Sequence, residues 1–169
     1  MFISICNDDH NLAKAALFII EHKHMIHPAY TTTDMVALIY GYVTNGHIIT
    51  VKDGNGDIIG VTAFFIGTED EQFRNKQIAY VDIAVCKKEY KLSRMFMRGL
   101  SFLIHILAKE YPTVEQVQFA ALIDNEYLCK LYNKLTTSHF DRPGTIGEER
   151  VFSAPISHFQ SFLAKFSLL

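Results

Sequence analysis

The chain has few cysteines, no surplus of basic residues and no apolar run long enough to span a membrane. Its three cysteines lie far apart without a CxxC pair, which is typical of reduced thiols and not of a disulfide framework. The net charge is −2, so no overall basic field predicts a nucleic-acid partner. The N-terminal stretch MFISICNDDH is acidic where a signal peptide would be basic. We therefore expect a cytoplasmic protein without a membrane partner.

The composition predicts an ordinary globular protein. The 169 residues are enough for one compact domain with its own core, and 49% hydrophobic with 20% charged residues argues against disorder. Neither an internal repeat nor a linker is evident along the chain. We expect a single domain over residues 1–169, in which residues 156–169 form a C-terminal helical extension.

The hydrophobic pattern predicts a mixed order of strands and helices. Strands are expected at 1–5, 47–52, 57–67, 78–85 and 114–124, with two edge strands within 136–155; helices are expected at 12–25, 31–46, 93–110, 125–135 and 156–166. The Asp-Gly-Asn-Gly turn at 53–56 is a strong hairpin signal. Three strands follow one another without helices, which excludes an all-parallel sheet, and a later β-α-β crossover requires a parallel pair. The predicted class is α/β with a mixed sheet.

A cluster of cations stands at the start of the predicted helix 93–110. Ser93 suits the N-cap, Arg94 lies in the first turn, Arg98 follows one turn later and Lys91 lies just upstream. Because a helix N-terminus is itself positive, these cations repel one another unless an anion lies among them. A phosphate or diphosphate would satisfy both the side chains and the backbone N–H groups. The alternative is a solvated basic surface.

Two stretches match a known family pattern. In the first stretch, IAYVDIAVCKKEYKLSRMF, the residues at the defined positions of the pattern R/Q-x-x-G-x-G/A are Lys91, Arg94 and Phe96. The second stretch, NEYLCKLYNKL, matches the pattern N-x-x-A-x-x-L-Y-x-K-L except that Leu128 replaces the alanine. With its element order up to about residue 152, the chain resembles the GNAT superfamily of acyl-CoA-dependent N-acetyltransferases. The resemblance implies a mostly antiparallel sheet with a parallel pair at the cofactor groove, flanked by helices.

The resemblance also implies acetyl-CoA as co-substrate and an amine of a small molecule or protein as acceptor. The strand backbone would pair with the pantetheine arm, and the loop would hold the diphosphate. The implied cofactor-binding residues are Ile83, Ala84, Val85, Lys91, Ser93, Arg94, Arg98 and Asn125. Arg94 and Phe96 replace glycines and remove their backbone freedom. Either a guanidinium replaces the backbone contacts, or the site has degraded.

Three further side chains are candidates for chemistry or acceptor binding. Tyr132 matches the family's general-acid tyrosine; the alternative is a core aromatic at helical spacing. Asp82 is the candidate base, because burial of a carboxylate in an apolar strand raises its pKa toward a useful range; the alternative is a surface acid. Tyr80, on the same face by strand alternation, is the candidate acceptor-binding residue.

Other patterns weigh against metal and nucleotide chemistry. His22, His24 and His27 lie close together without the carboxylate-histidine pattern of a zinc enzyme, so no metal is expected. Cys86 is interpreted as a loop thiol. The chain lacks GxGxxG and GKS/T, which argues against a βαβ nucleotide-binding module.

Two functions stay open from the sequence. The first is an N-acetyltransferase, and the second is a binding or structural protein on the same fold that has lost catalysis. In the second case the apolar C-terminal FQSFLAKFSLL would serve a partner or homodimer contact, although packing against its own domain is the ordinary role of such a segment.

Overall fold

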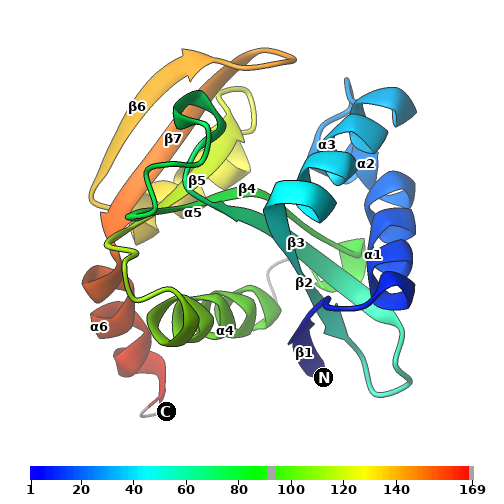
Figure 1. The fold of residues 1–169 in the computed structure, drawn as a ribbon, viewed down its shortest axis with the longest axis horizontal. Helices are drawn as coiled ribbons and strands as arrows, with labels where there is room; N and C mark the ends of the chain where they lie inside the picture. The colour runs from blue at the N-terminus through cyan, green and yellow to red at the C-terminus, as the bar shows by residue number, and fades with distance from the viewer. Residues whose placement is uncertain (91–93, 168–169) are drawn as a thin grey trace. The chain divides into compact units, whose positions relative to one another are not determined.

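The computed structural model describes residues 1–90 and 94–167, so the predicted cofactor-binding residues Lys91 and Ser93 lie outside the described residues. The strands are β1 (Phe2–Ile5), β2 (Gly46–Lys52), β3 (Ile58–Ile66), β4 (Ile78–Cys86), β5 (Gln116–Leu122), β6 (Ser138–Pro143) and β7 (Glu148–Pro155). The helices are α1 (Asp9–Glu21), α2 (Lys23–Ile26), α3 (Thr32–Asn45), α4 (Met95–Glu110), α5 (Glu126–Leu135) and α6 (Ile156–Ser167), with short 3₁₀ turns η1 (Glu69–Glu71) and η2 (Lys88–Tyr90) (Figure 1).

The strands form one mixed sheet in the order β1-β2-β3-β4-β5-β7-β6. β4 and β5 run parallel, whereas β1 with β2, β2 with β3, β5 with β7, and β6 with β7 run antiparallel. The predicted α/β class with a mixed sheet is confirmed. One detail of the prediction is wrong, because β7 is not an edge strand but lies between β5 and β6. Its Val151 and Phe152 are at most 1% exposed, as expected for a strand with neighbours on both sides.

The chain forms two compact units. Unit 1 comprises Met1–Phe65 and Asp82–Gly99, and unit 2 comprises Ile66–Val81 and Leu100–Leu169. β4 and α4 each continue from one unit into the other along the chain.

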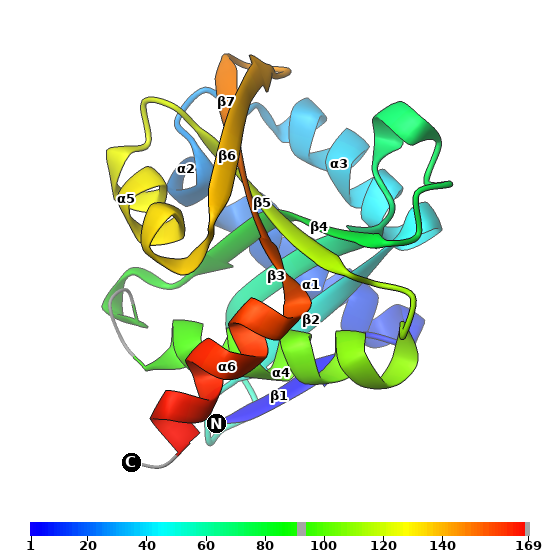
Figure 2. The same ribbon diagram turned by 90° about the vertical axis from the view of Figure 1, so that its left-hand side faces the viewer.

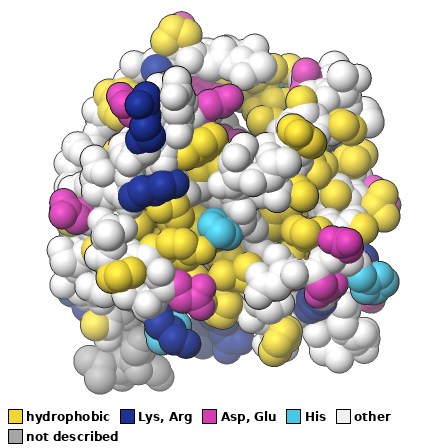
Figure 3. Space-filling model, in the orientation of Figure 1, with side chains coloured by type: hydrophobic (Ala, Val, Ile, Leu, Met, Phe, Trp, Pro, Cys, Tyr) yellow, Lys and Arg dark blue, Asp and Glu magenta, His cyan; other side chains and the backbone are white. Residues whose placement is uncertain are grey.

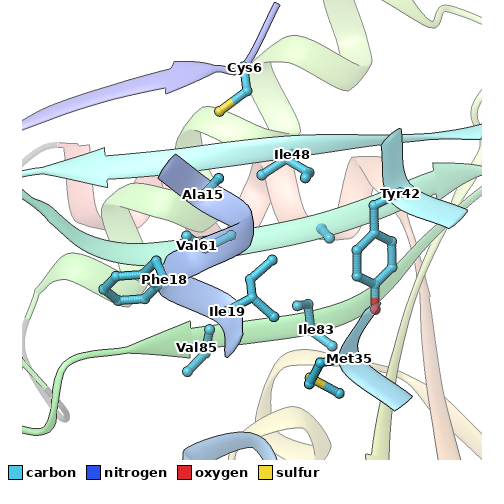
Figure 4. Packing of buried hydrophobic residues seen from close by; sticks show 11 residues of the cluster. Cys6, Ala15, Phe18, Ile19, Met35, Tyr42, Ile48, Val61, Ile83 and Val85 are labelled. Carbon is cyan, nitrogen blue, oxygen red and sulfur yellow. The ribbon is translucent and has the colours of Figure 1, made fainter. Parts of the chain in front are cut away.

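Unit 1 is organised around two capped helices. The Asp8 carboxylate accepts the Asn11 N–H at the start of α1, and Thr31 forms a capping box with Asp34 at the start of α3. Side chains from both helices pack on β2, β3 and the end of β4 (Figure 4). The buried residues of this cluster are Cys6, Ala15, Phe18, Ile19, Met35, Tyr42, Ile48, Val61, Ala63, Ile83 and Val85. The helix expected at 12–25 is divided at His22, whose ring stacks on Phe18 and whose Nδ1 lies 2.9 Å from the Phe18 carbonyl.

Unit 2 has a core of aromatic rings. Phe119 of β5 contacts Tyr132 of α5 and Phe159 of α6, with ring centroids 5.1 and 5.7 Å apart. Figure 2 shows α6 following directly from β7, with α5 near the β6–β7 hairpin. Phe159 is fully buried, while Phe166 is 51% exposed. The C-terminal helix thus packs within unit 2 along its first turns.

The loop from β3 to β4 depends on a glycine. Gly67 has φ +91°, and a Cβ there would lie 2.8 Å from the Phe73 backbone. Gln72 and Phe73 also have positive φ. Asn75 holds the loop by accepting the Thr68 N–H and donating to the Thr68 hydroxyl, at 2.8 and 2.9 Å.

We expect Gly67→Ala to lower the free energy of unfolding by about 1–3 kcal/mol, because it adds a strained φ and a clash with backbone that cannot move away cheaply. The matched control is Gly54→Ala in the β2–β3 turn, where a Cβ meets nothing within 4 Å. Urea denaturation of both variants measures the difference. Equal midpoints for the two variants would contradict this interpretation of the loop.

Candidate functional site

The predicted base, Asp82, lies at the centre of β4, where a buried side chain contacts it. The Tyr42 hydroxyl of α3 donates a hydrogen bond to Asp82 Oδ2 at 2.5 Å, the short distance of a charge-assisted O–H···O⁻ bond. Tyr42 is 1% exposed and Asp82 is half-buried. A carboxylate that accepts a hydrogen bond from a buried hydroxyl is held in one orientation. Asp82 is therefore not a solvated surface acid, and its role as a base stays a prediction.

The residues after Asp82 alternate between core and partial exposure. Ile83 and Val85 are 4% and 7% exposed and belong to the unit 1 core, while Ala84 is half-buried. Their side chains are occupied by packing, so any contribution from Ile83 or Val85 to a ligand comes from the backbone. Cys86 is the last residue of β4, so its interpretation as a loop thiol is wrong. The strand simply extends one residue further than predicted.

The start of α4 presents two cations to solvent. Arg94 and Arg98 are exposed and one turn apart, joined by the Arg98 N–H donating to the Arg94 carbonyl at 3.1 Å. The first turn of α4 contains no acidic residue that would neutralise the helix end. Guanidinium groups and a helix N-terminus are both donors that suit a phosphate or diphosphate.

A glycine that the sequence prediction missed lies beside this helix start. A Cβ on Gly60 of β3 would lie 3.2 Å from Met95 Cε and 3.4 Å from the Val85 carbonyl oxygen. Gly60 thus allows the first residue of α4 to pack closely against the sheet. An isolated glycine within a predicted strand was the sequence signal that could have indicated this close approach of α4 to β3.

In unit 2 the predicted general acid lies in an aromatic core. Tyr132 is 2% exposed, and its ring centroid lies 5.1 Å from that of Phe119 and 5.8 Å from that of Phe152. Burial raises the pKa of Tyr132 well above its usual range, with smaller effects from Tyr127 and Cys129. The phenol therefore stays protonated at neutral pH, which is the form a proton donor needs. Asn125 caps the same helix, its side chain accepting the Leu128 N–H at 3.2 Å.

Tyr80, the predicted acceptor-binding residue, is held by an arginine. Arg142 Nη2 of β6 donates to the Tyr80 hydroxyl at 2.6 Å, and the other guanidinium nitrogens pair with Glu149 and Asp70 at 3.3 and 3.2 Å. Tyr80 itself is 7% exposed. Figure 3 shows Lys and Arg side chains beside acidic ones in the region of β6 and β7. Contact of Tyr80 with an acceptor stays a prediction, and Arg142 was missed because 62 residues separate it from Tyr80.

The structure thus groups the described candidates by unit. Unit 1 holds Asp82, Ile83, Ala84, Val85, Arg94 and Arg98; unit 2 holds Tyr80, Asn125 and Tyr132. Across residues 1–90 and 94–167, no three His, Cys, Asp or Glu side chains gather as metal ligands would. Nor does any helix within these ranges have the length and apolar character to cross a bilayer.

The described fold has a parallel β4–β5 pair, with α4 between the two strands and α5 after β5, in a sheet whose other pairs described above are antiparallel. No protein-family model matches the chain, and no curated protein matches it in sequence. Among solved structures, a GNAT-family acetyltransferase from Staphylococcus aureus Mu50 is similar with a TM-score of 0.68 and 11% identity, over 92% of this chain and 99% of that one.

Two further solved acetyltransferase structures are similar to this chain over most of its length. Tetrahymena GCN5 has a TM-score of 0.66 and 13% identity, over 92% of this chain and 96% of its own. Spermidine N-acetyltransferase from Vibrio cholerae, solved in complex with CoA and spermine, has a TM-score of 0.60 and 12% identity, over 94% and 98%. The chain therefore has the GNAT fold, and the resemblance drawn from the sequence is confirmed at the level of the fold.

Proposed function

We propose that this protein is an N-acetyltransferase that transfers an acetyl group from acetyl-CoA to an amine of a small molecule or protein. The observation that carries the proposal is the GNAT fold over more than nine-tenths of the chain. The Vibrio cholerae relative in fold was solved with CoA and a polyamine, which supports this pairing of donor and acceptor. The half-buried Asp82 carboxylate supplies a group for proton transfer.

The donor set at the start of α4 fits the diphosphate of CoA. Arg94 and Arg98 provide cations, and the helix end provides N–H groups and a positive dipole. In this proposal the backbone of Ile83, Ala84 and Val85 binds the pantetheine arm. Acetyl-CoA supplies the activated acetyl thioester. Lys91, Ser93 and Asn125 complete the proposed cofactor-binding residues.

Proton transfer is divided between two residues. Asp82 accepts the proton that the acceptor amine releases as its nitrogen bonds to the acetyl carbon. The Tyr132 hydroxyl donates a proton to the departing sulfur as the carbon–sulfur bond breaks, and its burial keeps that proton in place at neutral pH. Tyr80 contributes to the acceptor site.

We expect Arg94→Glu to weaken CoA binding roughly tenfold to a hundredfold, since hydrogen bonds to charged groups contribute about 1.5–3 kcal/mol each. Lys109→Glu is the matched control, with the same charge change in the last turn of the same helix. Isothermal titration calorimetry with CoA measures both affinities. Equal losses in the two variants would contradict a specific diphosphate contact and indicate a general charge effect.

The second candidate function is a binding protein on the same fold that has lost catalysis. The dense packing of Tyr132 between Phe119 and Phe152 favours it, because a core tyrosine needs no catalytic role. A thermal-shift measurement separates the two candidates. An acetyltransferase is stabilised by CoA in proportion to its affinity, whereas no stabilisation at millimolar CoA would exclude the first candidate.

A further inference from the structure

A buried tyrosine reaches the predicted base from a distant part of the chain. Tyr42 lies in the last turn of α3, among the residues of the unit 1 core, and its hydroxyl donates a hydrogen bond to Asp82 Oδ2 at 2.5 Å. It is the neighbour of Ile83 and Met35 in the packed cluster (Figure 4). The hydroxyl of a buried tyrosine needs a hydrogen-bond partner, and here it has the carboxylate of the predicted base.

The ring of Tyr42 is fixed by its surroundings. Its centroid lies 5.4 Å from that of Phe65, the last residue of unit 1 on β3. Phe65 is in turn packed on the start of β2, where a Cβ on Gly46 would lie 2.9 Å from its ring. The helix itself is anchored by the Thr31–Asp34 capping box. The hydroxyl therefore has little freedom to leave Asp82.

The titratable side chains of α3 and β4 are hydrogen-bonded to other residues or exposed in the cases that follow. On α3, Asp34 accepts hydrogen bonds from Thr31, and Tyr40 is 72% exposed. β3, the neighbour of β4 in the sheet, has no titratable residue over Ile58–Ile66. On β4, the Tyr80 hydroxyl accepts from Arg142. The Tyr42 hydroxyl is thus a donor that α3 brings directly to the Asp82 carboxylate.

We propose that Tyr42 is a positioning residue that orients the Asp82 carboxylate and keeps it ionised as the proton acceptor. The inference rests on the proposed acetyltransferase function, in which Asp82 is the base. A hydrogen bond to the charged form of a carboxylate favours that form and opposes the effect of burial. A carboxylate has about four acceptor sites, so the bond at Oδ2 does not exhaust its capacity to take a proton.

The test is Tyr42→Phe, which keeps the ring and removes the hydroxyl. We expect the pKa of Asp82 to rise by about one unit, which moves the acidic limb of the kcat/KM pH profile upward by the same amount. At neutral pH kcat should fall about threefold to tenfold, while KM for acetyl-CoA stays the same. The matched control is Tyr40→Phe, which removes an exposed hydroxyl from the same helix and should change none of these quantities.

Two measurements do not depend on activity. A carbon-13 NMR titration of the Asp82 carboxyl, assigned with Asp82→Asn, gives its pKa in wild type and in Tyr42→Phe. In the wild type alone, the Tyr42 hydroxyl proton should be protected from exchange and shift when Asp82 is protonated. An unchanged Asp82 pKa in the variant, or a hydroxyl proton that is insensitive to the Asp82 titration, overturns the inference. Failure of the proposed function is seen separately, as a wild type that neither binds CoA nor acetylates any amine.

Discussion

Replacing Asp82 by asparagine is expected to lower kcat/KM for acetyl transfer by roughly 10²–10⁴-fold, the usual contribution of a positioned general base. Asparagine keeps the size of the side chain and accepts the Tyr42 hydrogen bond through its amide oxygen, but it cannot take up a proton. The loss should therefore appear in kcat, and it should be largest where the wild-type carboxylate is ionised. Release of free thiol from acetyl-CoA with a panel of amines measures the rate.

Two controls show whether this loss is chemical. Asp57→Asn makes the same change in the exposed β2–β3 turn and should leave kcat/KM unchanged. CoA affinity of Asp82→Asn should equal that of wild type, since the proposed diphosphate contacts lie at Arg94 and Arg98. An Asp82→Asn protein with wild-type kcat and an unchanged pH profile would show that another group is the base.

The order of strands and helices was largely predictable because each signal is local. Asp-Gly-Asn-Gly between two β-branched runs predicts the β2–β3 hairpin, and the uninterrupted meander predicts a mixed sheet. The place of β7 inside the sheet was not predictable, because alternation indicates a strand without indicating its neighbours. The division of the first helix at His22 was also missed, since the helical spacing of apolar residues continues across it.

The candidate site was predictable only for residues that stand out against their own neighbours in sequence. Asp82 is a carboxylate inside an apolar strand, and Arg94 is a cation at a positive helix end. Their partners carry no such signal. Tyr42 has the spacing of an ordinary core residue of α3 and lies 40 positions from Asp82, and Arg142 stands in a strand at the edge of the sheet. Tertiary contacts of this kind follow from the fold and not from a local pattern.

Tyr132→Phe is expected to lower kcat roughly 10²-fold if the hydroxyl protonates the departing thiolate, while the free energy of unfolding changes by only about 1 kcal/mol. The ring contacts with Phe119 and Phe152 survive this change, so packing and chemistry are separated. Stopped assays of acetyl transfer measure kcat, and urea denaturation measures stability. Tyr127→Phe, on the exposed side of the same helix, is the matched control and should alter neither quantity.

Tyr132→Ala removes the ring as well as the hydroxyl, so it separates the packing of this side chain from its chemistry. Loss of a fully buried aromatic lowers the free energy of unfolding by about 3–5 kcal/mol, whatever the function of the hydroxyl. If Tyr132 is purely structural, Tyr132→Phe should have wild-type kcat, and Tyr132→Ala should show a large loss in the free energy of unfolding. If Tyr132 is the general acid, Tyr132→Ala should show the same loss of stability, and Tyr132→Phe should also have a lower kcat. Because burial raises the pKa of Tyr132, its deprotonation should not set the alkaline limb of the wild-type pH profile below about pH 10.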